Sequence, residues 1–528
     1  MNEPVNIRKI IAASSVGTMI EWYDFYIFGM LARTISTQFF PEGNATAALL
    51  STLAIFAAGF IVRPFGALVF GRLGDLIGRK YTFLLTLVLM GGSTFLIGLV
   101  PNYKAIGIAA PLLVLALRLI QGLALGGEYG GAATYVAEHA PVGKRGFYTS
   151  WIQTTATLGL FVALGIIMLV KLNMSDEQFN AEWGGWRYPF WISILLVAVS
   201  VYIRLKMKES PMFSKLKTEG KTSVNPLKES FSHRANFKMV LLALFGAVMG
   251  QGVIWYTGQF YAQNFLETKC NIEFEQSRTI MLWAIAFATP FFLFWGWLSD
   301  KIGRKWIMMA GMLGGIILYR PIFSEFLKDS DPAPVASSYT IFHKADTTYK
   351  KIGKDSVREI RMTGSNEKGI RFLRTETEVF GETDIPGGEI VEIMEGGDTL
   401  KTKPVISIGY KSDPNPKYSG IILDTATYVK FIFLVWVLIL LVTMVYGPIA
   451  AFLVEMFPTK IRYTSMSLPY HIGNGVFGGL VPFIGLLLTT TYPKDPLVGL
   501  WYPIGVAALC FIIGTIYLTN KIDKEVND

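Results

Sequence analysis

The sequence GRLGDLIGRK occupies residues 71–80, and a second copy of its pattern, GWLSDKIGRK, occupies residues 296–305. Both copies hold Gly, Asp, Gly, Arg and Lys at the same spacing, and Asp75 and Asp300 are 225 positions apart. Each copy lies between two long apolar runs. The pair therefore predicts a duplicated unit whose two halves can be compared with each other.

Composition places the duplicated unit in a membrane. The chain of 528 residues is 52% hydrophobic and 16% charged, and it contains 37 Phe and 12 Trp. Soluble chains rarely have so much apolar mass, and runs of about 20 apolar residues, long enough to cross a hydrocarbon core, recur along the sequence. The net charge of +9 resides mainly in short loops, where Lys and Arg orient a membrane protein. We therefore expect a lipid bilayer, and no nucleic acid, as its surroundings.

The apolar runs predict the fold class. We predict an all-α membrane protein with twelve transmembrane helices in two pseudo-symmetric six-helix bundles, and a polar, β-rich external insert between spans nine and ten. The predicted parts are the N-terminal bundle (1–205), a cytoplasmic linker (206–237), spans seven to nine (238–323), the insert (324–424) and spans ten to twelve (425–528).

The residue pattern of the insert predicts its structure, and a second repeat, after spans four and ten, gives its length. Its apolar residues alternate with polar ones, as at 388–393 and 404–408, which is typical of short half-exposed strands. After span four, Glu138 is matched after span ten by Glu455, 317 positions later. This offset exceeds that of the first repeat by 92 residues. The loop between spans nine and ten is therefore 92 residues longer than the loop between spans three and four. The loop after the third span lies opposite the motif loop, so we expect the insert outside the cell.

Loop charges predict the orientation. Lys and Arg are dense in the loops at 72–80, 144–145, 206–238, 301–305 and 460–462. The positive-inside rule places these loops and both termini in the cytoplasm.

The first half has ionisable residues within its spans, where each charge costs roughly 2.5–3.5 kcal/mol on insertion scales. Span one contains Glu21 and Asp24, span two Arg63, and span four Arg118 and Glu128. Burial favours the neutral form of an acid, so Asp24, with Glu21 as a second candidate, is predicted to carry a proton. Arg118 and Arg63 are predicted to bind a substrate carboxylate. Two alternatives stay open: Arg118 holds the acid ionised until substrate arrives, and Arg63 pairs with Glu128 to lock helices.

The spans of the second half have almost no charge. Gln251, Tyr256 and Gln259 in span seven and Asn474 in span eleven are candidate substrate contacts. Bonding between helices is at least as good an interpretation for each, and we expect a structural role for His471. The sequence contains no metalloprotease or nucleophile-elbow motif. We therefore expect no enzyme activity, no cofactor and no metal site.

Several further stretches resemble the major facilitator superfamily, and specifically its metabolite:proton symporter family, which includes shikimate, 2-oxoglutarate, citrate and proline/betaine carriers. The duplicated motif is the superfamily's signature, and the resemblance covers the chain except roughly 324–424. The other matching stretches are EWYDFY (21–26), RPFGA (63–67), RLIQG (118–122), GGEYGG (126–131) and EMFPTKIR (455–462).

The resemblance implies proton-coupled uptake of a small organic acid or zwitterionic osmolyte by alternating access, across a bacterial inner membrane. It also implies a gate of cytoplasmic charges that holds the outward-open state. Two alternatives remain: efflux or uncoupled exchange of a similar solute, and a sensor that binds an extracytoplasmic partner through the insert on a carrier scaffold. The implied gate residues are Asp75, Arg79, Glu138 and Arg145 in the first half, and Asp300, Arg304, Glu455 and Arg462 in the second.

Overall fold

The chain forms two compact units. Unit 1 comprises residues 1–262, 282–320 and 435–528, and unit 2 comprises residues 263–281 and 321–434. The structure is a computed structural model. It describes residues 7–77, 79–127, 133, 136–137, 140–141, 143–206, 234–331, 341–352, 355–365, 369–380, 417–457 and 462–519.

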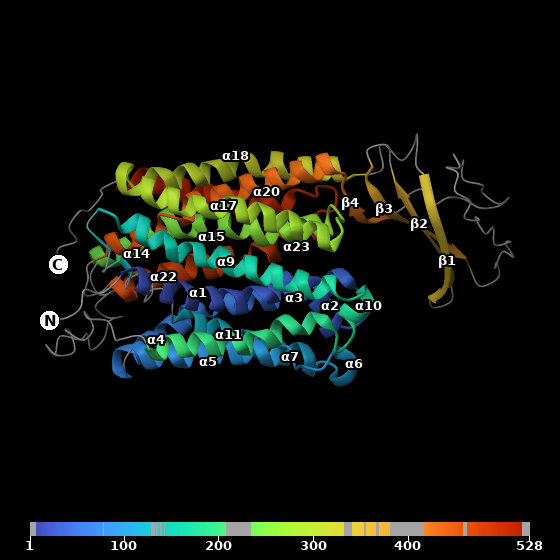
Figure 1. The fold of residues 1–528 in the computed structure, drawn as a ribbon. Helices are drawn as coiled ribbons and strands as arrows, with labels where there is room; N and C mark the ends of the chain where they lie inside the picture. The colour runs from blue at the N-terminus through green and yellow to red at the C-terminus, as the bar shows by residue number, and fades with distance from the viewer. Residues whose placement is uncertain are drawn as a thin grey trace. The chain divides into compact units, whose positions relative to one another are not determined.

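The first half of the chain is helical (Figure 1). Its elements are α1 (Ile7–Met30), α2 (Ala32–Phe39), α3 (Ala45–Ile61), α4 (Arg63–Ile77), α5 (Arg79–Ile97), α6 (Tyr103–Ile106), α7 (Ala109–Gly126), α9 (Arg145–Leu172), α10 (Asp176–Asn180), η1 (Gly185–Arg187) and α11 (Tyr188–Lys206).

The second half repeats the helical pattern, with a sheet between α18 and α20. Its helices are α14 (Arg234–Ala243), η2 (Leu244–Val248), α15 (Met249–Tyr256), η3 (Thr257–Tyr261), α16 (Ala262–Thr268), α17 (Phe274–Ile302), α18 (Lys305–Ser330), α20 (Thr425–Tyr446), α21 (Ile449–Met456), α22 (Arg462–His471), η4 (Ile472–Gly478), α23 (Val481–Thr491), η5 (Val498–Leu500) and α24 (Trp501–Tyr517).

The helices confirm the predicted membrane architecture. Among the described residues, nine helical stretches are long and apolar enough to cross a bilayer. The other three predicted spans coincide with α1, α5 and α11. Predicted span two is divided into α3 and α4, which meet at Val62. Pro64 is the second residue of α4, and because proline has no N–H it cannot donate to the carbonyl one turn earlier.

Unit 2 contains the predicted β structure. Its strands form one antiparallel sheet in the order β1-β2-β3-β4, and all four fall within residues 324–424. The predicted strands at 388–393 and 404–408 lie outside the described residues. The strands are β1 (Ile341–Ile352), β2 (Asp355–Ser365), β3 (Arg371–Phe380) and β4 (Lys417–Ile422).

Glycines let α7 cross α3 and α4 with their backbones in contact. A Cβ atom added to Gly122 would lie 1.8 Å from the carbonyl oxygen of Gly59. One added to Gly126 would lie 2.1 Å from the carbonyl oxygen of Arg63. These distances show that the glycines of α7 allow close helix approach. The crossing also brings the helices of Arg118 and Arg63 together.

We predict that Gly122→Ala destabilises unit 1, because the added methyl group must push α3 and α7 apart. Overpacking of this kind typically costs about 1–3 kcal/mol. Gly165→Ala in α9 is the matched control, since a Cβ there meets nothing within 4 Å. Thermal unfolding in detergent should show a lower midpoint for Gly122→Ala alone, and equal midpoints would contradict the proposed contact.

Candidate functional site

Arg118 is buried in the middle of the first half. It is fully enclosed, and its guanidinium lies 4.0 Å from the ring centroid of Phe25 and 5.1 Å from that of Phe56. Nη1 donates to Gln121 Oε1 (2.6 Å) and to the Phe25 carbonyl (3.4 Å), and Nη2 donates to the Phe56 carbonyl (3.4 Å). Aromatic faces and carbonyl oxygens both stabilise a cation. Arg118 therefore joins α7 to α1 and α3, and its Nε has no partner among the described residues.

Asp24 lies on the other side of Gln121 and forms no ion pair with Arg118. Gln121 Nε2 donates to the Asp24 backbone carbonyl (3.2 Å) and to Thr94 Oγ1 (2.5 Å). The Asp24 carboxylate faces α5, where a Cβ added to Gly91 would lie 3.2 Å from Oδ2. The residue is completely buried, its carboxylate has no ion-pair partner among the described residues, and its polar neighbour is the Ser193 side chain of α11. The alternative in which Arg118 holds Asp24 ionised therefore has no support in this geometry.

Arg63 is another buried guanidinium close to Arg118, at 1% exposure. It lies 4.0 Å from the ring centroid of Phe60, 4.5 Å from that of Phe25 and 5.3 Å from that of Trp22. Phe25 is thus shared by both arginines. The Nε and Nη2 atoms of Arg63 have no partner among the described residues. The predicted partner Glu128 lies outside the described residues, and Glu21 is buried at 1% exposure.

Aromatic side chains from both halves surround Arg63. Trp22 stacks on Tyr26 at 4.9 Å between centroids, and Tyr26 lies 5.3 Å from Trp255 of the second half. The Trp255 Nε1 and Tyr26 Oη atoms are buried without a partner among the described residues. Tyr256 packs edge-on against Phe60 at 5.0 Å. We did not single out Trp22, Tyr26 or Trp255 from the sequence as residues of this site. The aromatic run at 21–26 is a sequence signal for the first two.

The amides of the second half divide into two kinds. Gln251 and Asn474 bond each other twice, with Nε2 to Oδ1 at 3.0 Å and Nδ2 to Oε1 at 2.8 Å. This reciprocal pair joins α15 to η4. It corresponds to the alternative interpretation, in which these amides bond one helix to another rather than contact substrate. Gln259 lies in η3, and both its amide atoms are buried without a partner among the described residues. Gln259 and Asn474 thus each lie in a π-helical segment, η3 and η4 respectively, and such segments often occur at functional sites.

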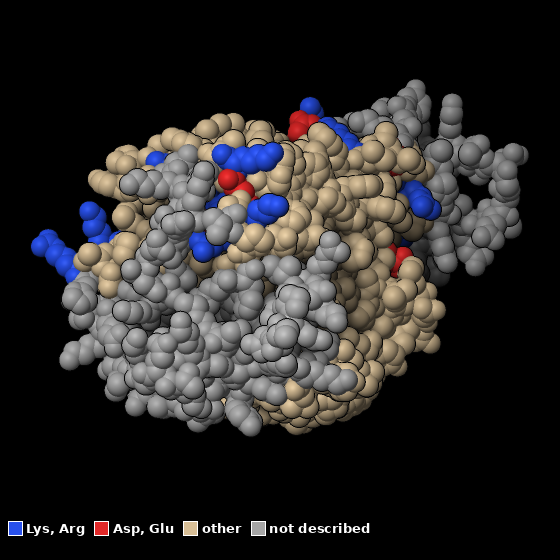
Figure 2. Space-filling view, turned by 60° about the vertical axis from the view of Figure 1, so that its left-hand side comes forward, with Lys and Arg blue, Asp and Glu red and all other residues tan. Residues whose placement is uncertain are grey.

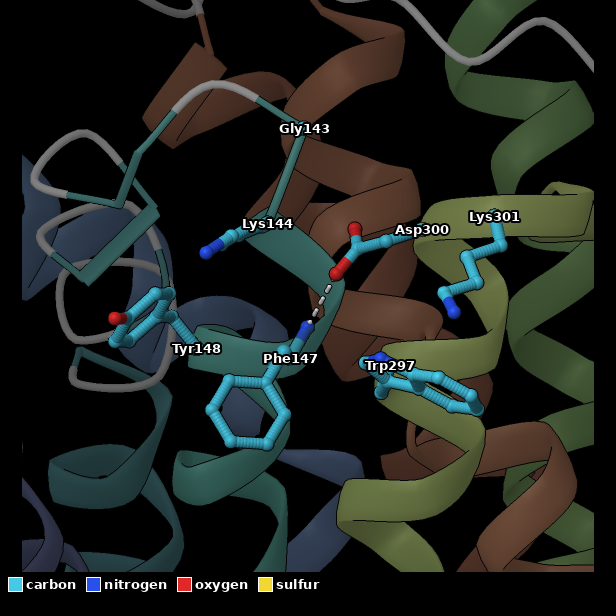
Figure 3. Close-up of a pocket in the computed structure, with 7 residues that line it drawn as sticks. All are labelled: Gly143, Lys144, Phe147, Tyr148, Trp297, Asp300 and Lys301. Atoms are coloured by element: carbon cyan, nitrogen blue, oxygen red, sulfur yellow. Dashed lines mark hydrogen bonds between the residues drawn. The ribbon is translucent and has the colours of Figure 1, made fainter.

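The second motif copy connects the two halves. Asp300 accepts hydrogen bonds from the backbone N–H groups of Gly146 and Phe147, both at 2.8 Å, at the start of α9. Figure 3 shows the bond from Phe147. Arg304 Nη1 lies 2.9 Å from Asp300 Oδ1, and its Nε and Nη2 donate to Glu455 at 3.0 and 2.8 Å. We call Asp300, Arg304 and Glu455 the motif cluster.

Opposite charges stabilise the motif cluster. Its three side chains are between 2% and 7% exposed. Burial alone would lower the pKa of Arg304, but hydrogen bonding to Glu455 and the charges of Glu455 and Asp300 outweigh it and raise that pKa. Helix N-termini also favour a carboxylate. Figure 2 shows Lys and Arg side chains near a few acidic ones on the face turned forward.

The rest of the predicted gate is described only in part. The side chains of Asp75, Arg79, Glu138 and Arg462 lie outside the described residues. Arg145 begins α9, and its Nε and Nη1 atoms are buried without a partner among the described residues.

We predict that Asp300→Asn exposes the start of α9. The amide keeps one acceptor oxygen but loses the negative charge, and hydrogen bonds to charged groups contribute about 1.5–3 kcal/mol. Hydrogen exchange at the Gly146 and Phe147 amides should quicken by about tenfold or more. Asp495→Asn, at a surface pair with Arg320, is the control. Unchanged exchange in Asp300→Asn would contradict the role of these bonds.

Two six-helix halves that meet around buried charged and aromatic side chains define a membrane transporter. The comparisons with known proteins agree. Residues 9–220 match the family described as "Sugar (and other) transporter", and residues 140–343 match "MFS/sugar transport protein". The chain covers nearly all of the solved D-xylose-proton symporter (99% of this chain and 100% of that one) with a TM-score of 0.63 at 14% identity. That likeness shows the fold alone.

Sequence relatives fix the family. The Escherichia coli inner membrane metabolite transport protein YhjE is 39% identical over 57% of this chain and 69% of its own. The E. coli alpha-ketoglutarate permease is 36% identical over 62% and 73%. The E. coli proline/betaine transporter is 34% identical over 60% and 64%, so the chain spans somewhat under two thirds of that relative. This chain belongs to the major facilitator superfamily, among its metabolite transporters, and is a multi-pass membrane protein rather than an enzyme.

Proposed function

We propose that the protein takes up a small organic acid together with a proton, across a bacterial inner membrane with both termini in the cytoplasm. The observation that carries the proposal is the set of buried polar atoms left without partners among the described residues. Arg63 Nε and Nη2, Arg118 Nε and Trp255 Nε1 are all hydrogen-bond donors. Buried donors require acceptors, and a carboxylate offers acceptor oxygens and the opposite charge.

Charge separates the two substrate classes. Arg63 and Arg118 both contact Phe25, so a bound carboxylate near that ring would meet two cations, whereas a bound ammonium would be repelled by them. The rings of Trp22, Tyr26 and Trp255 could still accept the ammonium of a zwitterion. Names of relatives point to both classes: an alpha-ketoglutarate permease and a proline/betaine transporter. We therefore place the organic acid first and the zwitterion second.

Asp24 supplies the proton site in this proposal. Its carboxylate is completely buried and faces α5 and α11 rather than the guanidiniums. An ionised acid in such surroundings is costly, so protonation should accompany closure of the two halves, and deprotonation should accompany opening. In this scheme the motif cluster, on the cytoplasmic side, holds the closed gate.

We predict that Asp24→Asn abolishes accumulation driven by a pH gradient, because the amide cannot exchange a proton. Exchange of labelled for unlabelled substrate, which needs no net proton movement, should survive. Proteoliposomes with an imposed gradient measure both, with 2-oxoglutarate and glycine betaine as probes. The same measurements on Glu21→Gln show whether Glu21 shares the proton role with Asp24. Glu42→Gln, at an exposed position, is the control.

Uphill uptake at full rate in Asp24→Asn would remove this residue from the mechanism. Accumulation by the unaltered protein that ignores the gradient would favour uncoupled exchange. Net movement of substrate only toward the extracytoplasmic side would favour efflux.

We predict that Arg63→Lys and Arg118→Lys have different consequences. Lys replaces a bidentate fork with a point charge. Arg63 has two donor atoms without partners, so Arg63→Lys should raise KM for a carboxylate about 10- to 100-fold, the size of a lost charged hydrogen bond, with little change in thermal stability. Arg118 bonds two backbone carbonyls, so Arg118→Lys should lower stability as well. Equal effects on KM and stability in both variants would contradict this division.

A further inference from the structure

A pocket adjoins the motif cluster and is distinct from the site around Arg63 and Arg118. It has a volume of about 290 Å³ and contains residues of both halves, from the start of α9 and the end of α17 (Figure 3). Its lining residues are Gly143, Lys144, Phe147, Tyr148, Trp297, Asp300 and Lys301.

The pocket has an excess of positive charge. Lys144 and Lys301 are exposed, and neither forms an ion pair with another described residue. The one acidic side chain of the lining, Asp300, is already bonded to two backbone N–H groups and to Arg304. Lys144 and Lys301 lie on opposite sides of the Asp300–Phe147 bond in Figure 3. Each lysine has a long flexible stem and can turn toward a shared anion.

The same pocket has an aromatic wall. Phe147, Tyr148 and Trp297 line it, and the Lys301 ammonium lies 3.9 Å from the Trp297 ring centroid. Trp297 is 42% exposed and Trp306, just beyond the motif, is 51% exposed. Exposed Trp and Tyr beside Lys and Arg are typical of the membrane–water interface, where lipid headgroups lie.

We propose that this pocket binds the headgroup of an anionic membrane phospholipid. Its phosphate pairs with Lys144 and Lys301, and its glycerol and upper acyl atoms contact Phe147 and Trp297. The aromatic wall favours a lipid over free phosphate, which has no apolar part. Lys144 belongs to the first half and Lys301 to the second. A bound lipid therefore holds the start of α9 against the end of α17 and stabilises the closed gate.

Binding to the purified full-length protein tests the proposal without any transport measurement. Native mass spectrometry should detect phosphatidylglycerol bound in preference to phosphatidylcholine. A basic residue near an anionic lipid contributes about 1 kcal/mol, so the double variant Lys144→Gln/Lys301→Gln should bind phosphatidylglycerol about 30-fold more weakly. The control Lys328→Gln/Lys494→Gln removes the same charge at exposed positions outside the pocket and should bind normally.

A second readout locates the effect. Phosphatidylglycerol should slow hydrogen exchange at the Gly146 and Phe147 amides, and the double variant should lose this response. If the double variant does not fold, Lys301→Gln alone carries the comparison. Equal binding of both lipids, an undiminished affinity in the lysine variants, or the same protection by inorganic phosphate would each overturn the proposal.

Discussion

The burial of the Arg63 and Arg118 guanidinium groups beside the ring of Phe25 is the constraint on which the arrangement of this membrane bundle depends. A charge within a bilayer must be compensated by the protein. Arg118 meets this requirement with Gln121, two backbone carbonyls and the face of Phe25. These contacts require α1, α3 and α7 to lie very close together. The backbone contact between Gly122 and Gly59 makes that distance attainable.

The two halves contribute different chemistry to the centre. The first half supplies the charges, and the second supplies rings and amides, including Trp255 and Gln259. Gln251 and Asn474 satisfy each other, so they stabilise the second half without needing a ligand. In the proposed alternating-access cycle, separation of the halves would withdraw these rings from the guanidiniums and let water reach them. The environment of the fixed charges would then differ between the two states.

The sequence predicts the large features because they depend on pattern. Apolar run lengths predict the spans, the repeat offset locates the β-rich insert, and charges within spans identify Arg63 and Arg118 as special. It does not predict which way the Asp24 carboxylate points, because helix spacing alone does not say which neighbour occupies each side. The bond from Asp300 to the α9 amides was also missed, since backbone donors carry no sequence signature.

As the proposed gate, the motif cluster needs bonds that are strong enough to hold the gate closed and weak enough to let it open. Hydrogen bonds to a charged group contribute about 1.5–3 kcal/mol each, so the two amide bonds of Asp300 together contribute roughly 3–6 kcal/mol. Ligand binding in the micromolar to millimolar range supplies about 4–8 kcal/mol. Because these free energies are similar, occupancy of a central site could offset the loss of the gate bonds. Arg304 keeps its bonds to Glu455 within the second half, so opening needs to break only the contacts that cross between halves.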